Sequence, residues 1–411
     1  MPRALAKKSL GIFQKPKPAP KPKPAASFGE LPQWNLKDLY PAMDSRAFAD
    51  DLTKAASDCR SFNVTYKGKL EELTKKASGA GLLEAIQRYE ALEELLGRIM
   101  SYAGLVYTED TADPERTKFY GDTQEKVTSA SSDLLFFELE LNRLDDDLAA
   151  KLAAGPLKHF RPWLEDIRKG KPYQLEDKLE QLFHEKAITG YGAWNRLFDE
   201  TIASLRFNVD GEELAIEPVL NLMQDPNDRT REKAALAFGG VLKANLRTFT
   251  LITNTLAKDK EISDRWRGFQ DVADARNLAN RVERDVVNAL ADAVRVAYPR
   301  LSHRYYRLKA AWFGKSALKH WDRNAPLPRV PSKTYQWEEA RDIVLGAYDN
   351  FSPRMSGIAR RFFDERWIDA PVRPGKQPGA FAHPAVPSVH PYVLLNYQGK
   401  PRDVMTLAHE L

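Results

Sequence analysis

The residues whose types and spacing point to chemistry stand in the run Thr406–Leu411, which reads TLAHEL. A helix that carries His-Glu-x-x-His brings two imidazoles onto one face, where both can bind a single Zn²⁺, and the Glu points at the metal-bound water. Here the first His and the Glu are present, and the second His of the pattern would fall two positions beyond Leu411. We therefore expect His409 to be a metal ligand and Glu410 to be the catalytic base.

A His-Glu pair by itself is a weak signal. The chain contains a second pair, His184-Glu185, in which Ile188 stands where the metal pattern requires a second His. One alternative is therefore that His409 is an ordinary helical side chain and that the protein is a non-catalytic helical scaffold or a peptide-binding protein. The elements around each pair decide between these interpretations.

The segment before His409 has the order that a metal-dependent peptidase requires. A buried strand is predicted over 392–397, a turn over 398–401, and an apolar helix over 404–408. In such an arrangement an edge strand holds an extended peptide by main-chain hydrogen bonds beside the metal helix. For His383 and His390, each followed by Pro, we favour loop structure over catalysis.

The rest of the chain has mostly helical periodicity. Apolar residues recur at steps of three and four from Leu82 to Ile99, and Asp113-Pro114 is typical of a capped helix start. A hairpin over 207–216 is predicted to turn at Asp210-Gly211. Further helices are expected from 114 towards 139, from 228 through about 258, over roughly 283–314, and over roughly 335–366. The fold class is therefore mainly α, with a small β-sheet placed late.

The charge distribution argues against nucleic-acid binding. Residues 1–30 contain seven basic side chains and one acid, while the whole 411-residue chain carries a net charge of +5, so the remaining residues are close to neutral. The Lys/Pro alternation over 15–24 predicts an extended, disordered tail. The single Cys59 excludes an intramolecular disulfide and fits a reducing cytoplasm. Apolar runs are too short for a bilayer span or a signal peptide, so we expect a cytoplasmic protein without membrane contact.

Three late runs resemble the oligoendopeptidase F group of the thimet-oligopeptidase-like zinc metallopeptidases. These runs are 375–381 (GKQPGAF), 390–397 (HPYVLLNY) and 403–411 (DVMTLAHEL). Segments 34–40, 189–200, 267–269 and 277–280 are similar to earlier parts of that family. The resemblance covers about residues 31–411.

The resemblance implies a helical ellipsoid of the zincin type, split by a channel with the zinc helix at its floor. It implies one Zn²⁺ in the complete enzyme, short peptides as substrates, His409 as the first zinc ligand and Glu410 as the general base. Strands over 379–381 and 392–397 would line the cleft and bind substrate. The residues assigned to this role are Gly379, Ala380, Phe381, Tyr392 and Asn396.

The resemblance also implies three parts, namely a tail over 1–30, a helical domain over 31–200 and the start of a catalytic domain over 201–411. The family pattern requires a second His on the metal helix and a Glu from a later helix. We therefore expect that the sequence is partial and truncated inside the motif, and that this chain alone binds zinc poorly and hydrolyses no peptide.

Overall fold

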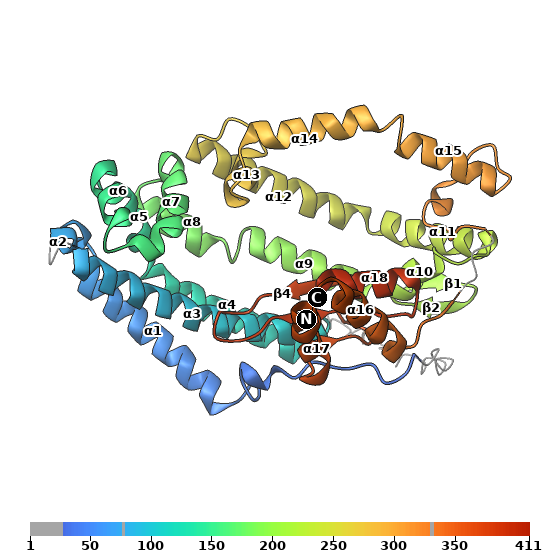
Figure 1. Ribbon diagram of the computed structural model, residues 1–411, viewed down its shortest axis with the longest axis horizontal. Coiled ribbons are helices and arrows are strands. Elements are labelled where there is room, and N and C mark those ends of the chain that lie inside the picture. Colours follow the sequence, from blue (N-terminus) through green and yellow to red (C-terminus); the bar gives the residue numbers. More distant parts are fainter. Residues whose placement is uncertain (1–27, 76–78, 329–332) are drawn as a thin grey trace, which may run out of the picture.

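Residues 28–75, 79–328 and 333–411 are described by the computed structural model (Figure 1). The helices are α1 (Arg46–Tyr66), α2 (Leu70–Lys75), α3 (Ala80–Glu109), α4 (Pro114–Ser132), α5 (Leu135–Arg143), α6 (Asp146–Ala154), α7 (Arg161–Lys169), α8 (Asp177–Lys186), α9 (Tyr191–Ser204), α10 (Ile216–Leu222), α11 (Asp228–Ala244), α12 (Leu246–Arg267), α13 (Asp274–Ala279), α14 (Arg284–Ala297), α15 (Ser302–Trp312), α16 (Trp337–Phe351), α17 (Pro353–Asp364) and α18 (Pro401–Glu410). The strands are β1 (Phe207–Val209), β2 (Glu212–Leu214), β3 (Ile368–Asp369), β4 (Phe381–His383) and β5 (Tyr392–Leu394). The predicted class, mainly helical with a small late sheet, is confirmed. The Lys/Pro-rich tail predicted over 1–30 falls almost wholly outside the described residues.

The long N-terminal helices α1, α3 and α4 pack side by side in one layer (Figure 1). In α3 the predicted apolar face is buried from Leu82 to Ile99 against α1 and α4. The predicted start of α4 is also confirmed, because the Asp113 side chain accepts hydrogen bonds from the N–H groups of Glu115 and Arg116, with Pro114 as the first helical residue.

Four predicted helices were too long, and each is divided in two. The divisions lie between α4 and α5, α11 and α12, α14 and α15, and α16 and α17. At Asn245 the side-chain amide and the backbone N–H both donate to the carbonyl of Val241, at 2.9 and 3.2 Å, and a new helix begins. Pro299 lies between α14 and α15 and interrupts the predicted helix, because proline has no N–H to donate to a helical hydrogen bond. Ser352 caps α17 immediately before Pro353.

The strands form two small sheets. β1 and β2 are the predicted antiparallel hairpin, and Asp210 and Gly211 take the positive φ angles, 56° and 87°, that a tight Asp-Gly turn requires. The second sheet has the order β3-β5-β4, with β3 parallel and β4 antiparallel to β5. β5 is the central strand and is fully buried. β4 is an edge strand, and it begins at Phe381, one of the predicted substrate-binding residues.

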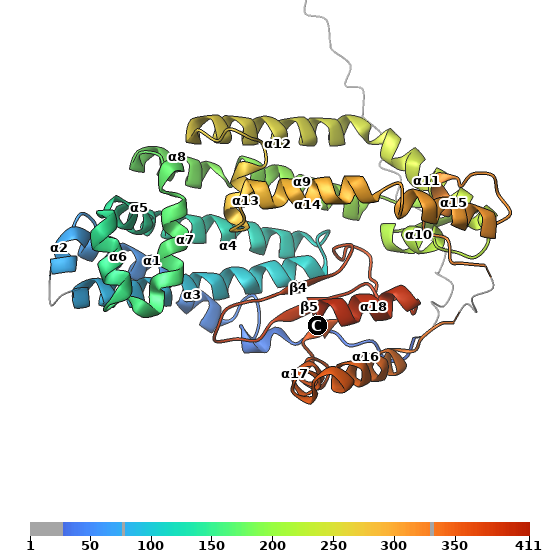
Figure 2. The ribbon, with the colours of Figure 1, turned by 45° about the horizontal axis from the view of Figure 1, so that its top comes forward.

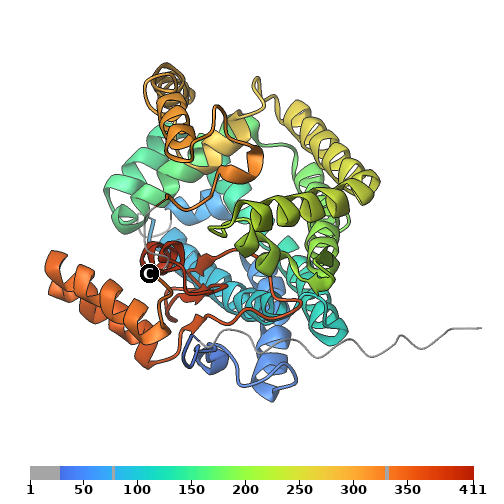
Figure 3. The same ribbon diagram turned by 90° about the vertical axis from the view of Figure 1, so that its right-hand side faces the viewer.

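The apolar interior has two parts. The larger cluster joins the N-terminal helices to the C-terminal sheet and α18, so it includes side chains on both sides of the predicted domain boundary at residue 200. The smaller cluster surrounds Phe207 and Val219, between the hairpin, α10 and α11. Because the larger cluster is shared, the C-terminal sheet and α18 pack on the N-terminal helices. In the view along the long axis, the α16–α17 pair lies to one side, beside the C-terminal end (Figure 3).

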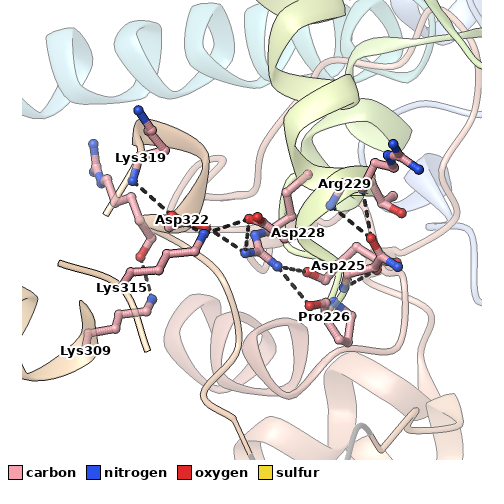
Figure 4. A network of polar contacts seen from close by, with 12 residues as sticks. Asp225, Pro226, Asp228, Arg229, Lys309, Lys315, Lys319 and Asp322 are labelled. Atoms are coloured by element: carbon pink, nitrogen blue, oxygen red, sulfur yellow. Dashed lines mark hydrogen bonds and ion pairs between the residues drawn. The ribbon is translucent and has the colours of Figure 1, made fainter. Parts of the chain in front are cut away.

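A buried polar network connects α11 to the short 3₁₀ turn His320–Asp322 (Figure 4). Arg231 is fully buried, and its guanidinium donates to Asp322 at 2.7 Å and to the carbonyls of Asp225 and Pro226 at 2.8 and 2.9 Å. Burial alone would raise the pKa of Asp322, but hydrogen bonds from Lys315 and Arg231 hold it below its ordinary value. The network fixes the turn His320–Asp322 on the start of α11.

Across the described ranges, no helix combines the length and the apolar character that a membrane crossing would need.

Candidate active site on the C-terminal helix

The helix that carries His409 is fixed at its start by Asp403. The Asp403 carboxylate accepts hydrogen bonds from the backbone N–H groups of Gln398 and Lys400, each at 2.9 Å, and Pro401 occupies the first helical position. Burial raises the pKa of Asp403, although these N–H donors oppose the shift. The side chain of Leu407 is completely buried, so α18 is held against the larger core by its apolar face.

The last turn of α18 is fixed by a contact from α16. The Tyr348 hydroxyl donates to the carbonyl of Ala408 at 2.6 Å. The turn of α18 that carries His409 and Glu410 is therefore held against α16.

Both residues line a cavity of about 460 Å³ between α18, α10 and the sheet. His409 is exposed and Glu410 is half-buried. Adjacent helical residues differ in direction by about 100°, so an imidazole and a carboxylate can both border one open space.

The opposite wall of the cavity comes from α10, which is far from α18 in the sequence. Glu217 accepts a hydrogen bond from the N–H of Gly379 at 2.7 Å, and the Lys400 ammonium donates to the carbonyl of Asn221 at 2.6 Å. Burial raises the pKa of Glu217 and lowers the pKa of Lys400. These contacts join α10 to the segments on both sides of β5 and set the width of the cavity.

The structure brings three of the five predicted substrate-binding residues to this cavity. Gly379, Ala380 and Asn396 line it, and the Asn396 amide donates to the carbonyls of Gln377 and Gly379 at 3.0 and 2.9 Å. Gly379 and Ala380 precede the observed strand β4, whereas the sequence predicted a strand over 379–381.

The other two predicted substrate-binding residues do not border the cavity. Tyr392 has no exposed surface, because its ring packs edge-on against Trp34 within the core. Phe381 packs against the same core from the edge strand. The prediction that the strands at Phe381 and Tyr392 bind substrate stays a prediction.

His383, His390 and His184 make contacts that fit structural roles. His383 lies at the end of β4 with its Nε2 2.9 Å from the Ser101 hydroxyl, and burial lowers its pKa. His390 stacks on Trp367 with ring centroids 3.7 Å apart. In the other His-Glu pair of the chain, His184 Nε2 lies 2.9 Å from the Ser131 hydroxyl.

The donor set of the cavity is suited to zinc but does not complete a site. Imidazole and carboxylate are the ligand types that Zn²⁺ takes in peptidases, and a catalytic site needs three protein ligands. Within residues 28–75, 79–328 and 333–411, no group of three or more His, Cys, Asp and Glu side chains is placed to hold a metal ion. The described residues therefore do not form a metal site by themselves.

Sequence reasoning missed Glu217, Lys400 and Asp403 as residues of the site. Asp403 could have been found, because an acid at the third helical position after Lys400-Pro401 is a helix-start signal. Glu217 could not, since its role depends on a contact with Gly379, 162 positions away.

Sequence profiles of known families match most of the chain. The profile described as Oligopeptidase F matches residues 140–207, and the profile of peptidase family M3 matches residues 221–411, a range that includes the sheet β3-β5-β4 and α18. The chain belongs to peptidase family M3, as an oligopeptidase F-type member. The predicted resemblance is therefore confirmed at the level of the family.

Curated relatives of this M3 chain include two bacterial oligopeptidases. Oligopeptidase PepF of Bacillus subtilis is 25% identical over 92% of this chain and 56% of its own length. Group B oligopeptidase PepB of Streptococcus agalactiae is 25% identical over 92% of this chain and 62% of its own length. The chain thus spans less than two thirds of each of these relatives.

Solved structures share the fold of this M3 chain. PZ peptidase A, determined with an inhibitor, superposes with a TM-score of 0.72 at 14% identity, covering 92% of this chain and 63% of that one. Oligoendopeptidase F from Enterococcus faecium superposes with a TM-score of 0.62 at 20% identity, covering 78% and 64% respectively. The helical peptidase architecture expected from the sequence is confirmed by these neighbours.

Proposed function

We propose that this chain forms the N-terminal helical part and the first catalytic residues of a zinc-dependent oligoendopeptidase that hydrolyses short peptides. The observation that carries the proposal is the placement of His409 and Glu410 on one wall of a cavity whose other walls are α10 and the edge of the sheet. The match to peptidase family M3 includes the sheet and α18, which form two of the walls of that cavity. Peptide substrates and zinc are properties that family membership supports for the whole protein.

The residues present here would divide the work as follows. His409 would supply one ligand of the metal, whose contribution when bound is to polarise the scissile carbonyl. Glu410 would take a proton from the attacking water and return it to the leaving amine. The edge strand β4 would hold an extended peptide by main-chain hydrogen bonds, since only its other edge is paired with β5.

The proposal is tested with protein expressed from the complete gene. We expect it to cleave an internally quenched peptide of about ten residues, to lose that activity after treatment with 1,10-phenanthroline, and to regain it on addition of Zn²⁺. The 411-residue chain by itself should cleave nothing, because its described residues supply only part of a zinc site. Hydrolysis that survives complete metal removal would contradict the proposal.

The same proposal includes a cytoplasmic location. Cys59 is free and buried, which fits a compartment where thiols stay reduced. Immunodetection of the protein in fractionated cells tests this point, and recovery in a secreted fraction would contradict it.

A further inference from the structure

A separate cavity lies at the end of the molecule that holds α11 and α15. It has a volume of about 550 Å³ and is formed by one face of α15 and by the segment 316–323 that follows this helix. Figures 1 and 2 show α15 beside α11, while α18 lies nearer the middle of the molecule. The cavity shares no lining residue with the cavity at His409, so the proposed peptidase site does not use it.

The ionisable side chains of this cavity are basic on both of its walls. His303 and Arg307 come from α15, and Lys319, His320 and Arg323 come from the segment that forms the other wall. Tyr306 is the remaining titratable residue of the lining, and no Asp or Glu of the described residues takes part in it. Positive groups on two walls of one cavity attract an anion into the space between them.

These basic side chains have no counter-charge in the described part of the chain, where none of the five forms an ion pair. The segment 300–323 contains seven Lys and Arg residues and a single acid, Asp322. Asp322 is completely buried, and it accepts hydrogen bonds from Arg231 at 2.7 Å and from Lys315 at 2.8 Å (Figure 4). The one acid of the segment is therefore already bound to two other cations.

The walls of the cavity are held together by contacts that leave its basic side chains available. The buried Lys309 of α15 donates to the backbone carbonyl of Arg323 at 2.8 Å. The backbone N–H of Lys319 donates to the Asp322 carboxylate at 2.9 Å. Because both contacts use backbone atoms of the second wall, the guanidinium of Arg323 and the ammonium of Lys319 can contact a ligand.

The chemistry of these groups selects phosphate oxygens. A guanidinium binds a phosphate group through two parallel hydrogen bonds, and a lysine ammonium adds a compact positive charge. Cavities that bind small molecules have volumes of roughly 300–1,000 Å³, so the space is suited to a ligand with several phosphate groups. Tyr306 adds an aromatic ring to the lining, on which a planar base can stack.

We propose that this cavity binds a small polyphosphate compound, with Arg307 and Arg323 contacting its phosphate groups from the two walls. The observations are the basic lining without a carboxylate, the absence of ion pairs from its side chains within the described residues, and the fixed arrangement of the walls. This chemistry has two sources, an inorganic polyphosphate and a nucleoside triphosphate.

Isothermal titration of the full chain with three probes tests the site and distinguishes the sources. The probes are tripolyphosphate, adenosine triphosphate and adenosine, at physiological ionic strength and without magnesium. Tighter binding of adenosine triphosphate identifies a nucleotide as the ligand, and equal or tighter binding of tripolyphosphate identifies an inorganic polyphosphate. Adenosine should not bind, because it carries no charge. Absence of saturable binding by both phosphate compounds overturns the proposal.

A double variant assigns the binding to the two walls. Arg307→Gln/Arg323→Gln removes one guanidinium from each wall, and we expect it to bind the phosphate compound at least about tenfold more weakly. Neither side chain forms a hydrogen bond within the described residues, so this variant should melt at the temperature of the unmodified chain. The melting temperature therefore separates lost binding from misfolding.

A matched control excludes binding that follows total charge alone. Arg354→Gln/Arg360→Gln removes two exposed arginines of α17 that do not line the cavity. It has the same net charge as the first double variant and keeps the same basic residues over 1–30, so it should bind as the unmodified chain does. Equal affinity in the two double variants would overturn the assignment.

Discussion

At the residue scale, burial determines what the ionisable side chains near the sheet contribute. Lys376 has a fully buried side chain, and its ammonium donates to the Asp369 carboxylate and to the carbonyls of Pro371 and Leu395 at 2.8 and 2.6 Å. Burial lowers the pKa of Lys376 to about 8, although the Asp369 charge opposes the shift. One side chain thus connects β3, β5 and the loop that leads to Gly379.

Replacing this lysine should destabilise the fold. Lys376→Met removes all of these hydrogen bonds and leaves Asp369 buried with Arg373 alone, so we expect a loss of about 3–5 kcal/mol in the free energy of unfolding. Urea denaturation measures it. The control Lys54→Met removes an exposed ion pair with Asp58 and should cost less than about 1 kcal/mol. Equal losses of unfolding free energy in the two variants would show that the buried Lys376 network stabilises the fold no more than an exposed ion pair does.

Glu138 should give stability a pH dependence that a glutamine removes. Its folded-state pKa is raised by burial, so its contribution to stability is fully present below the ordinary carboxyl pKa and is lost as pH rises through the raised value. We expect Glu138→Gln to unfold at higher urea than the unmodified chain at pH 8, with the difference shrinking towards pH 4. A constant difference at every pH would exclude an unpaired, desolvated carboxylate at this position.

At the element scale, α18 depends on contacts that no local pattern encodes. The strand–turn–helix order was predicted from a short apolar run, the turn residues after it and a second apolar stretch, and β5, the turn and α18 follow it. The strand is shorter than predicted, because only Tyr392–Leu394 pairs with neighbours on both sides. The helix breaks at Asn245 and Ser352 were missed because apolar periodicity continues across them, whereas the caps that end the ladder are single polar side chains.

The hydrogen bond from Tyr348 on α16 to the Ala408 carbonyl on α18 should contribute measurably to stability. Tyr348→Phe removes the donor to the Ala408 carbonyl, so we expect a loss of about 1 kcal/mol in stability and faster amide hydrogen exchange in residues 407–411. Tyr305→Phe is the matched control, because Tyr305 is exposed on α15. Unchanged exchange at the end of α18 in Tyr348→Phe would show that this contact does not hold His409 in place.

At the scale of the whole molecule, the sequence predicted the family and the helical class because family segments are spread along most of the chain. It did not predict the wall formed by α10. That wall depends on a contact between Glu217 and Gly379, which lie 162 positions apart in the sequence. Local sequence patterns therefore identified His409 and Glu410, whereas the cavity wall beside them depends on tertiary packing.

The central claim is that His409 and Glu410 begin the active site of a zinc peptidase. Protein from the complete gene, purified as Glu410→Gln and as Glu185→Gln, provides the direct test, since Glu185 belongs to the other His-Glu pair of the chain. Zinc content and cleavage of an internally quenched peptide are measured for both. We predict that Glu410→Gln keeps its zinc but loses at least about a hundredfold in kcat, while Glu185→Gln keeps both. Undiminished cleavage by Glu410→Gln would contradict the account.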